Sequence, residues 1–307
     1  MSEAALAWPA PLQHIDWHQP WLAPYAAQGQ PCAQAVLRGV PVWQALSQLL
    51  PPCAPGDPEP PTFVDHADLP AGQAYEAYIY QTRRVPTRCG AHDFFNGLMW
   101  LNWPCTKAAL NQRQWQAIEA AGGVGHTRGT TRDALTLLDE NGGILLAHPA
   151  IWDALRHRQW HTALVELRPL WAQAQLFIIG HALLEQLLLY PRKSLTAHLW
   201  LPTPPVQDWA AQAVVQAQPS VSPVGGPLDL AQLDAVLAQA LLQDDFGQGD
   251  GLEACAPSKP FTPLPVMGTP GWCADNAYAA FYDDPQVFRV LRAHQNPPQR
   301  VAPIDKH

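Results

Sequence analysis

The segment GHALLE contains the most informative pair of ionisable side chains in the sequence. His181 and Glu185 are four residues apart, so on a helix they project from the same face. The predicted helix around them, residues 171–189, is apolar nearly all round, which is typical of a buried element. An unpaired buried carboxylate costs several kcal/mol. The pair therefore predicts either a metal or acid–base site, where desolvated ionisable groups concentrate, or a structural hydrogen bond that bridges to Arg88 or Arg132.

A second polar group lies in RVPTRCGAHDFFNGLMWL, directly before a dense aromatic and aliphatic run. His92 and Asn96 are one helical turn apart and share a face. This spacing suits a metal ligand or acid–base group beside an amide. Asp93 also fits a simpler role, since a carboxylate at a helix start accepts backbone N–H bonds as an N-cap.

Two further groups supply carboxylates and imidazole. Asp139 and Glu140 precede Asn141 at the tip of a predicted hairpin, where they would coordinate a metal or act as ordinary turn residues. Thr196 and His198 fall on the same side of a predicted strand. If that side meets the helix that carries the GHALLE histidine, two imidazoles would converge; otherwise His198 is a half-buried structural residue.

Several sequence signatures of catalysis are absent. His181 and Glu185 do not form HExxH, which requires two histidines, and the chain has no GxGxxG after a strand and no GxxxxGK[ST] loop. It also lacks the GxSxG nucleophile elbow. Cys89 lies three residues before His92, which is weak support for a cysteine nucleophile.

Composition restricts the partners. Net charge is −8, and the longest basic clusters are Arg83-Arg84 and Arg192-Lys193, so neither nucleic acid nor an anionic membrane surface is expected. No apolar run reaches the ~18 residues that span a bilayer. The six cysteines show no CxxC spacing and the N-terminus no signal peptide, which predicts free thiols in the cytoplasm. The composition does not exclude a small molecule as a partner.

The hydrophobic periodicity predicts a mainly helical protein of the α+β class with a tryptophan-rich core, since 48% of residues are hydrophobic and 13 are Trp. Asn141-Gly142 between two apolar runs predicts a β-hairpin near 133–147. The predicted strands cover 62–66 and 194–201. The predicted helices cover 41–50, 74–82, 92–103, 104–121, 149–156, 159–168, 171–189, 207–217 and 228–242, with a helical patch near 277–284.

Thirty-three prolines gather in the N-terminal region, in 51–62 and from Pro257 onward, where they predict loops and extended arms. The expected organisation is a proline-rich arm with a short helix (1–60), a helical core (61–245) and a tail that packs on it (246–307), all in one domain.

The strings VPTR..HDFFN.L.WL, RDALTLLDENGG, GHALLE, TAH and PLPVMGTPGW occur in this order between about Phe63 and Arg289. This combination resembles a bacterial protein family of unknown function. The resemblance covers most of the chain and implies no activity. The resemblance implies an acidic–polar pair where this chain has Cys89-Gly90, and this difference argues against Cys89 as a nucleophile.

Three functions are considered. The first is a metal-dependent hydrolase that uses zinc, manganese or iron. Its candidate catalytic residues are His92, Asp139, Glu140 and Glu185. Its candidate metal ligands are His92, His181, Glu185 and His198. Its candidate ligand-binding residues are Arg88, Asn96, Lys107 and Arg132. The alternative is a non-catalytic binding or scaffold protein in which the same side chains form a structural network. A haem or other cofactor pocket around His181 is a third option.

Overall fold

A computed structural model describes residues 7–51, 60–123, 129–200, 229–244, 246 and 261–291. Its α-helices are α1 (Ala26–Leu37), α2 (Val42–Ser47), α3 (Tyr75–Thr82), α4 (Ala91–Asn102), α5 (Pro104–Ala120), α6 (Thr130–Asn141), α7 (Pro149–Arg156), α8 (Arg168–Trp171), α9 (His181–Leu189) and α11 (Leu230–Gln243). Its strands are β1 (Thr62–Asp65), β2 (Arg84–Thr87), β3 (Gly142–Leu146), β4 (Gln175–Ile178), β5 (Thr196–Trp200) and β6 (Phe261–Pro265). A π-helix covers Thr162–Glu166, and short 3-10 helices include His66–Asp68 and Ala279–Asp283.

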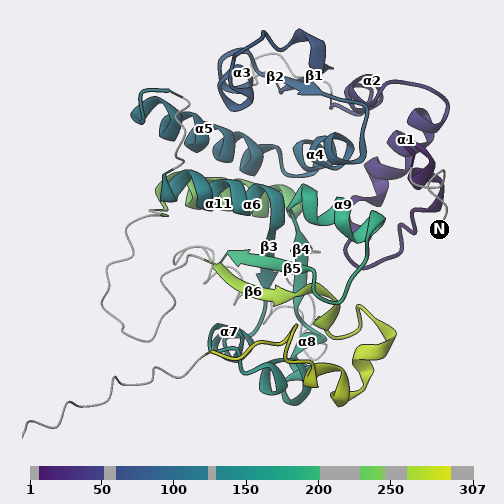
Figure 1. The fold of residues 1–307 in the computed structure, drawn as a ribbon, viewed down its shortest axis with the longest axis vertical. Coiled ribbons are helices and arrows are strands. Elements are labelled where there is room, and N and C mark those ends of the chain that lie inside the picture. The colour runs from purple at the N-terminus through teal and green to yellow at the C-terminus, as the bar shows by residue number, and fades with distance from the viewer. Residues whose placement is uncertain are drawn as a thin grey trace, which may run out of the picture.

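The elements lie in layers (Figure 1). Helices α4 and α5 pack on a second helical layer of α6, α9 and α11. The four-stranded sheet lies beyond this second layer, and α7 and α8 lie on its far side. The short pair β1 and β2 runs parallel above α4 and α5, beside α2 and α3. The mainly helical α+β class predicted from periodicity is confirmed.

The larger sheet has the order β4-β3-β5-β6. Strand β3 pairs antiparallel with β4 and parallel with β5, and every one of its residues is buried, as expected for a central strand. Strand β6 pairs antiparallel with β5 and forms an edge. Its two prolines, Pro263 and Pro265, are compatible with that place because an edge strand need not donate every backbone N–H.

The apolar run after His92 forms the densest part of the core. Phe94, Phe95, Leu98 and Met99 are all fully buried on α4. Pro104 opens α5 at its first position, as predicted. The carboxylate of Asp234 on α11 then caps this helix across the interface, accepting the backbone N–H groups of residues 105 and 106 at 2.8 Å each.

Three predictions about elements are wrong. The hairpin near 133–147 is instead α6 followed by β3, since Ala134, Leu135 and Leu138 recur with helical spacing and pack inward. The single helix 171–189 is split, because Gln175–Ile178 forms β4 and only the second half is α9. The proline-rich region after Pro257 contains β6. The strands involved, β3, β4 and β6, each pair with a strand that is distant in sequence.

The remaining elements agree more closely with expectation. Predicted helices 41–50, 74–82, 92–103, 104–121, 149–156 and 228–242 and both predicted strands are present. The segment 159–168 holds the π-helix and the start of α8, whereas α1 was not predicted. The predicted helix 207–217 lies outside the described residues. Among the described helices, none is long and apolar enough to cross a membrane.

Candidate functional site

Two glycines bring the end of α6 against the start of α9. A Cβ on Gly180 would lie 2.5 Å from the Cα of Asn141, and a Cβ on Gly142 would overlap the carbonyl oxygen of Leu138. The backbone N–H groups of residues 179 and 180 both donate to the carbonyl of Gly142 at 3.0 Å. Because His181 directly follows this contact, its imidazole stands beside the last turn of α6, which carries Asp139 and Glu140.

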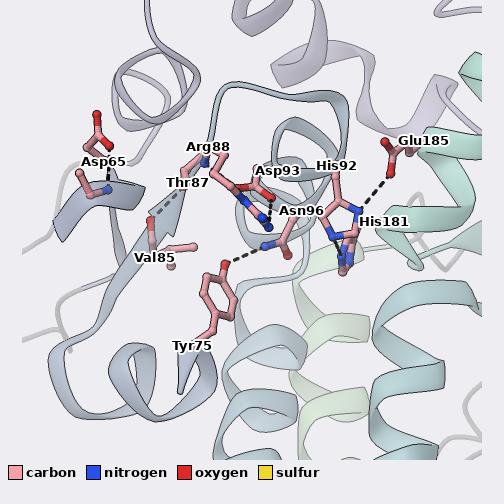
Figure 2. Close-up of polar contacts among 11 residues, drawn as sticks. Asp65, Tyr75, Val85, Thr87, Arg88, His92, Asp93, Asn96, His181 and Glu185 are labelled. Carbon is pink, nitrogen blue, oxygen red and sulfur yellow. Dashed lines mark hydrogen bonds and ion pairs between the residues drawn. The ribbon is translucent and has the colours of Figure 1, made fainter. Parts of the chain in front are cut away.

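The centre of the site is a pair of imidazoles that face one another (Figure 2). The Nε2 atoms of His181 and His92 are 3.1 Å apart, and the rings meet nearly edge to face. Glu185 lies on the other side of His92, with its Oε2 3.0 Å from Nδ1. Glu140 approaches the same centre, with its Oε2 3.4 Å from His181 Nε2. His92, His181 and Glu140 each offer a ligand atom, and these atoms lie within 4.8 Å of one another.

Burial, more than the neighbouring charges, keeps His181 neutral. Its side chain is only 4% exposed, and burial lowers its pKa to about 3, with Lys107 and His92 acting in the same direction against Asp139. The position of His181 at the start of α9 adds the positive end of a helix dipole. At neutral pH the ring therefore carries a lone pair on one nitrogen.

The carboxylates at the end of α6 occupy the opposite, electrostatically unfavourable end of a helix. Burial alone would raise the pKa of Asp139, but the Lys107 ammonium, through its charge and its hydrogen bond, outweighs burial and holds that pKa below its ordinary value. Burial and the charge of Asp139 raise the pKa of Glu140. Two carboxylates at a helix C-terminus are compensated here by a lysine, and a cation at the histidine pair would compensate them further.

A buried network surrounds the histidine pair. Lys107 is 6% exposed in its side chain and donates both to Asp139 and, at 2.8 Å, to Asn96 Oδ1. The amide nitrogen of Asn96 donates to the hydroxyl of Tyr75 at 3.0 Å. Burial raises the pKa of Tyr75, with nearby carboxylates adding to the shift, so its phenol stays protonated. All four groups line one cavity of about 270 Å³, together with His92, His181 and Glu140.

Asp93 lies on the cavity side of α4, and its carboxylate binds the loop that precedes this helix. It accepts the backbone N–H of Arg88 at 2.5 Å and pairs with the Arg88 guanidinium at 3.2 Å (Figure 2). The predicted N-cap role is therefore wrong: the N-cap position is Gly90, and Asp93 binds the chain just before the helix. Arg88 lines the cavity as well.

Most of the residues singled out in the sequence meet at this place. His92, His181, Asp139, Glu140, Asn96, Lys107 and Arg88 line the cavity, and Glu185 supports His92 from outside it. The predicted direct pair of His181 and Glu185 is replaced by an arrangement with His92 between them.

Two predicted residues do not join the group. His198 lies on β5 beside Phe261, with ring centroids 6.3 Å apart, and does not line the cavity. Arg132 pairs with Glu76 at 3.6 Å and does not line the cavity either. Cys89 is exposed and, like Cys32, Cys105 and Cys273, carries a free thiol.

Sequence reasoning missed Tyr75, Asn111 and Gln114, which also line the cavity. A signal for two of them is present, because Lys107, Asn111 and Gln114 recur at helical spacing on α5. From sequence alone, however, polar residues on one face of a helix are expected to face solvent. Asn111 and Gln114 are instead only 6% exposed.

Fold and site together define a mainly helical α+β protein with a His–His–carboxylate cluster beside a polar cavity. Residues 61–292 match the family model described as "Protein of unknown function (DUF3025)". The match spans more than half of the 307 residues, so the chain belongs to this family, and the resemblance noted in the sequence is confirmed. No curated protein and no solved structure matches the chain.

Proposed function

We propose that this protein is a metal-dependent hydrolase that binds a divalent cation through His92, His181 and Glu140. Two imidazoles and one carboxylate are a ligand set that suits zinc, iron or manganese. Three protein ligands leave a coordination position for water, which is the arrangement of catalytic rather than structural zinc sites.

The spacing of the ligand atoms supports this assignment. Bonds of about 2.0–2.1 Å that meet at a tetrahedral angle separate two ligand atoms by about 3.3 Å. The His92–His181 nitrogens are 3.1 Å apart, and His181 Nε2 is 3.4 Å from Glu140 Oε2. Both separations fit two ligands of one ion after shifts of a few tenths of an ångström.

The observation that carries the proposal is the far nitrogen of His181. Its Nδ1 is buried, makes no hydrogen bond of normal geometry with the described residues and lies 4.0 Å from Asp139 Oδ1; only the backbone of Asp139 offers the ring a weak acceptor. If Nε2–H donated to His92, Nδ1 would turn a lone pair toward an ionised carboxylate. With a metal at Nε2, the proton moves to Nδ1 and faces Asp139 instead, which removes the repulsion.

Glu185 completes the arrangement for the other histidine. A carboxylate that accepts Nδ1–H fixes the tautomer and turns the Nε2 lone pair toward the metal, as in the carboxylate–histidine–zinc arrangement. The 3.0 Å contact of Glu185 with His92 has this form. We therefore assign Glu185 to positioning His92 rather than to direct ligation.

The chemistry follows from the open position. A bound divalent metal lowers the pKa of its water toward 7. An ion held by His92, His181 and Glu140 would supply a hydroxide nucleophile for the hydrolysis of an acyl bond in a substrate bound in the cavity. The ammonium of Lys107, held by Asp139 and Asn96, would stabilise negative charge that develops on a substrate in the cavity.

Metal analysis tests the proposal directly. Protein purified without chelator should contain about one zinc, iron or manganese per chain, and titration of the chelated protein should restore it. His181→Ala and Glu140→Gln should each lose the metal, whereas His198→Ala, which changes an imidazole outside the cluster, should keep it. The second candidate, a structural network, predicts no stoichiometric metal and a loss of thermal stability without any metal response; it is favoured by the direct 3.1 Å contact of the two imidazoles.

A further inference from the structure

The cavity continues past Lys107 along α5 to a second polar group that the proposed metal centre does not use. Asn111 and Gln114 follow Lys107 by four and seven residues, so all three share one face of the helix. Two turns at 1.5 Å per residue place Gln114 about 10 Å along the axis from Lys107. Asn111 and Gln114 are both 6% exposed, and both line the cavity.

These two amides are incompletely satisfied. The Asn111 nitrogen donates to the carbonyl of Glu76 at 2.8 Å, which leaves its side-chain oxygen available. Gln114 forms no hydrogen bond with any residue in the described part of the chain. Buried side-chain amides are nearly always bonded to protein, water or ligand. Since the free groups line the cavity, their partner belongs inside it.

The charges that line this end of the cavity limit which chemical groups could bind the two amides. Glu76 lines it but is paired with Arg132 at 3.6 Å, so its charge is compensated. Leu110 and Ile79 add apolar surface to the lining, whereas Thr136 and His66, whose Nδ1 is buried without a hydrogen-bond partner among the described residues, add polar groups. Arg88 and Lys107, which also line the cavity, are paired with Asp93 and Asp139, so a carboxylate or phosphate would find no unpaired arginine or lysine among the lining residues. An alkyl group would leave both amides without partners. A neutral group that donates and accepts at once satisfies them.

We propose that Asn111 and Gln114 bind a carboxamide of the substrate, so that the reacting group and the recognised amide are separated by about 10 Å. The amide nitrogen of the ligand donates to the free side-chain oxygen of Asn111, and Gln114 exchanges a donor and an acceptor with the same group. This inference rests on the proposed metal-dependent hydrolase, and it names the substrate class: a small molecule or short peptide with a distal amide.

A series of hydroxamates of equal length tests this inference. The hydroxamate group binds the metal, and the group at the other end of the ligand reaches Asn111 and Gln114. The ligands carry about five methylene groups, to span about 10 Å, and end in carboxamide, carboxylate, hydroxyl or methyl. Calorimetry on zinc-loaded protein should give at least about tenfold tighter binding of the carboxamide than of the other three, the worth of about one net hydrogen bond.

Gln114→Met should abolish this preference without changing the metal content, and it should not weaken binding of the methyl compound. Gln116→Met, which changes an exposed glutamine on the same helix, should keep the preference. Equal affinity for all four tails, or preference for the carboxylate or hydroxyl, overturns the inference while leaving the metal centre intact. Failure of the wild-type protein to load metal overturns the proposed function and this inference with it.

Discussion

Lys107→Met is the substitution whose effect on stability follows most directly from the structure. It keeps the length of the side chain but removes the ammonium that binds Asp139 and Asn96. Removing one partner of a buried ion pair costs about 3–5 kcal/mol, because the other charge stays buried without compensation. Asp139 is 19% exposed in its side chain, so we expect a loss near the lower value, about 3 kcal/mol.

The loss is measured by urea unfolding and by the melting temperature of the metal-free protein. An unfolding entropy of about 2.1 cal/mol/K per residue gives about 0.6 kcal/mol/K for a chain of this length, so the melting temperature should fall by about 5 °C. The double variant Lys107→Met/Asp139→Asn should recover at least about half of the loss, since no uncompensated carboxylate remains.

The matched control is the exposed pair of Arg84 and Asp68, whose side chains are 44% and 43% exposed. Arg84→Met should lose less than about 1 kcal/mol, because solvent screens a surface pair. Equal losses for Lys107→Met and Arg84→Met would refute the reasoning, as would a double variant that is less stable than Lys107→Met alone.

The other predictions concern a cap, a packing contact, a titration and a buried hydroxyl. Asp234→Ala should destabilise the protein by about 2 kcal/mol in urea, since two N–H groups at the start of α5 lose their acceptor; a change below about 0.5 kcal/mol would contradict the capping role. Gly180→Ala should lower the melting temperature and weaken metal binding together, because the added methyl forces α9 away from α6; unchanged metal affinity in a folded variant would contradict this. The folded pKa of His181, about 3, is below its ordinary value of 6.5, so stability should fall as the pH drops from 6.5 toward 3. Metal-free wild type should therefore lose more stability than His181→Gln between pH 7 and pH 5, and parallel losses would contradict the assignment. Tyr25→Phe should cost about 1 kcal/mol in urea, since the hydroxyl donates to a buried carbonyl of β4 at 2.8 Å; a neutral effect would show that water replaces this bond.

Local sequence patterns were enough to predict most of the individual helices and strands. Pro104 marks the start of α5, and the helical repeat of buried residues on α4 marks that helix, because both signals arise within one or two turns. The same kind of reasoning misread Asn141-Gly142 as a hairpin turn. Gly142 is present because a side chain there would overlap Leu138, not because the backbone needs a positive φ.

For the site, residue type and spacing identified His92, His181, Glu185 and the two carboxylates of α6 as ionisable groups next to apolar elements. Burial of such groups demands partners, and that demand can be read from a sequence. The partners themselves could not be assigned: helical spacing paired His181 with Glu185, whereas the structure places His92 between them.

The sequence by itself determined which segments are apolar enough to be buried and which ionisable residues they carry, since both depend only on side-chain chemistry and local periodicity. The tertiary structure decided which of those residues meet. Close approach of Gly142 and Gly180 places α9 on α6, and α4 supplies His92 from about 90 residues earlier in the chain. It also leaves His198 on β5, away from the cavity. Contacts over such separations depend on how whole layers pack, and no local propensity encodes them.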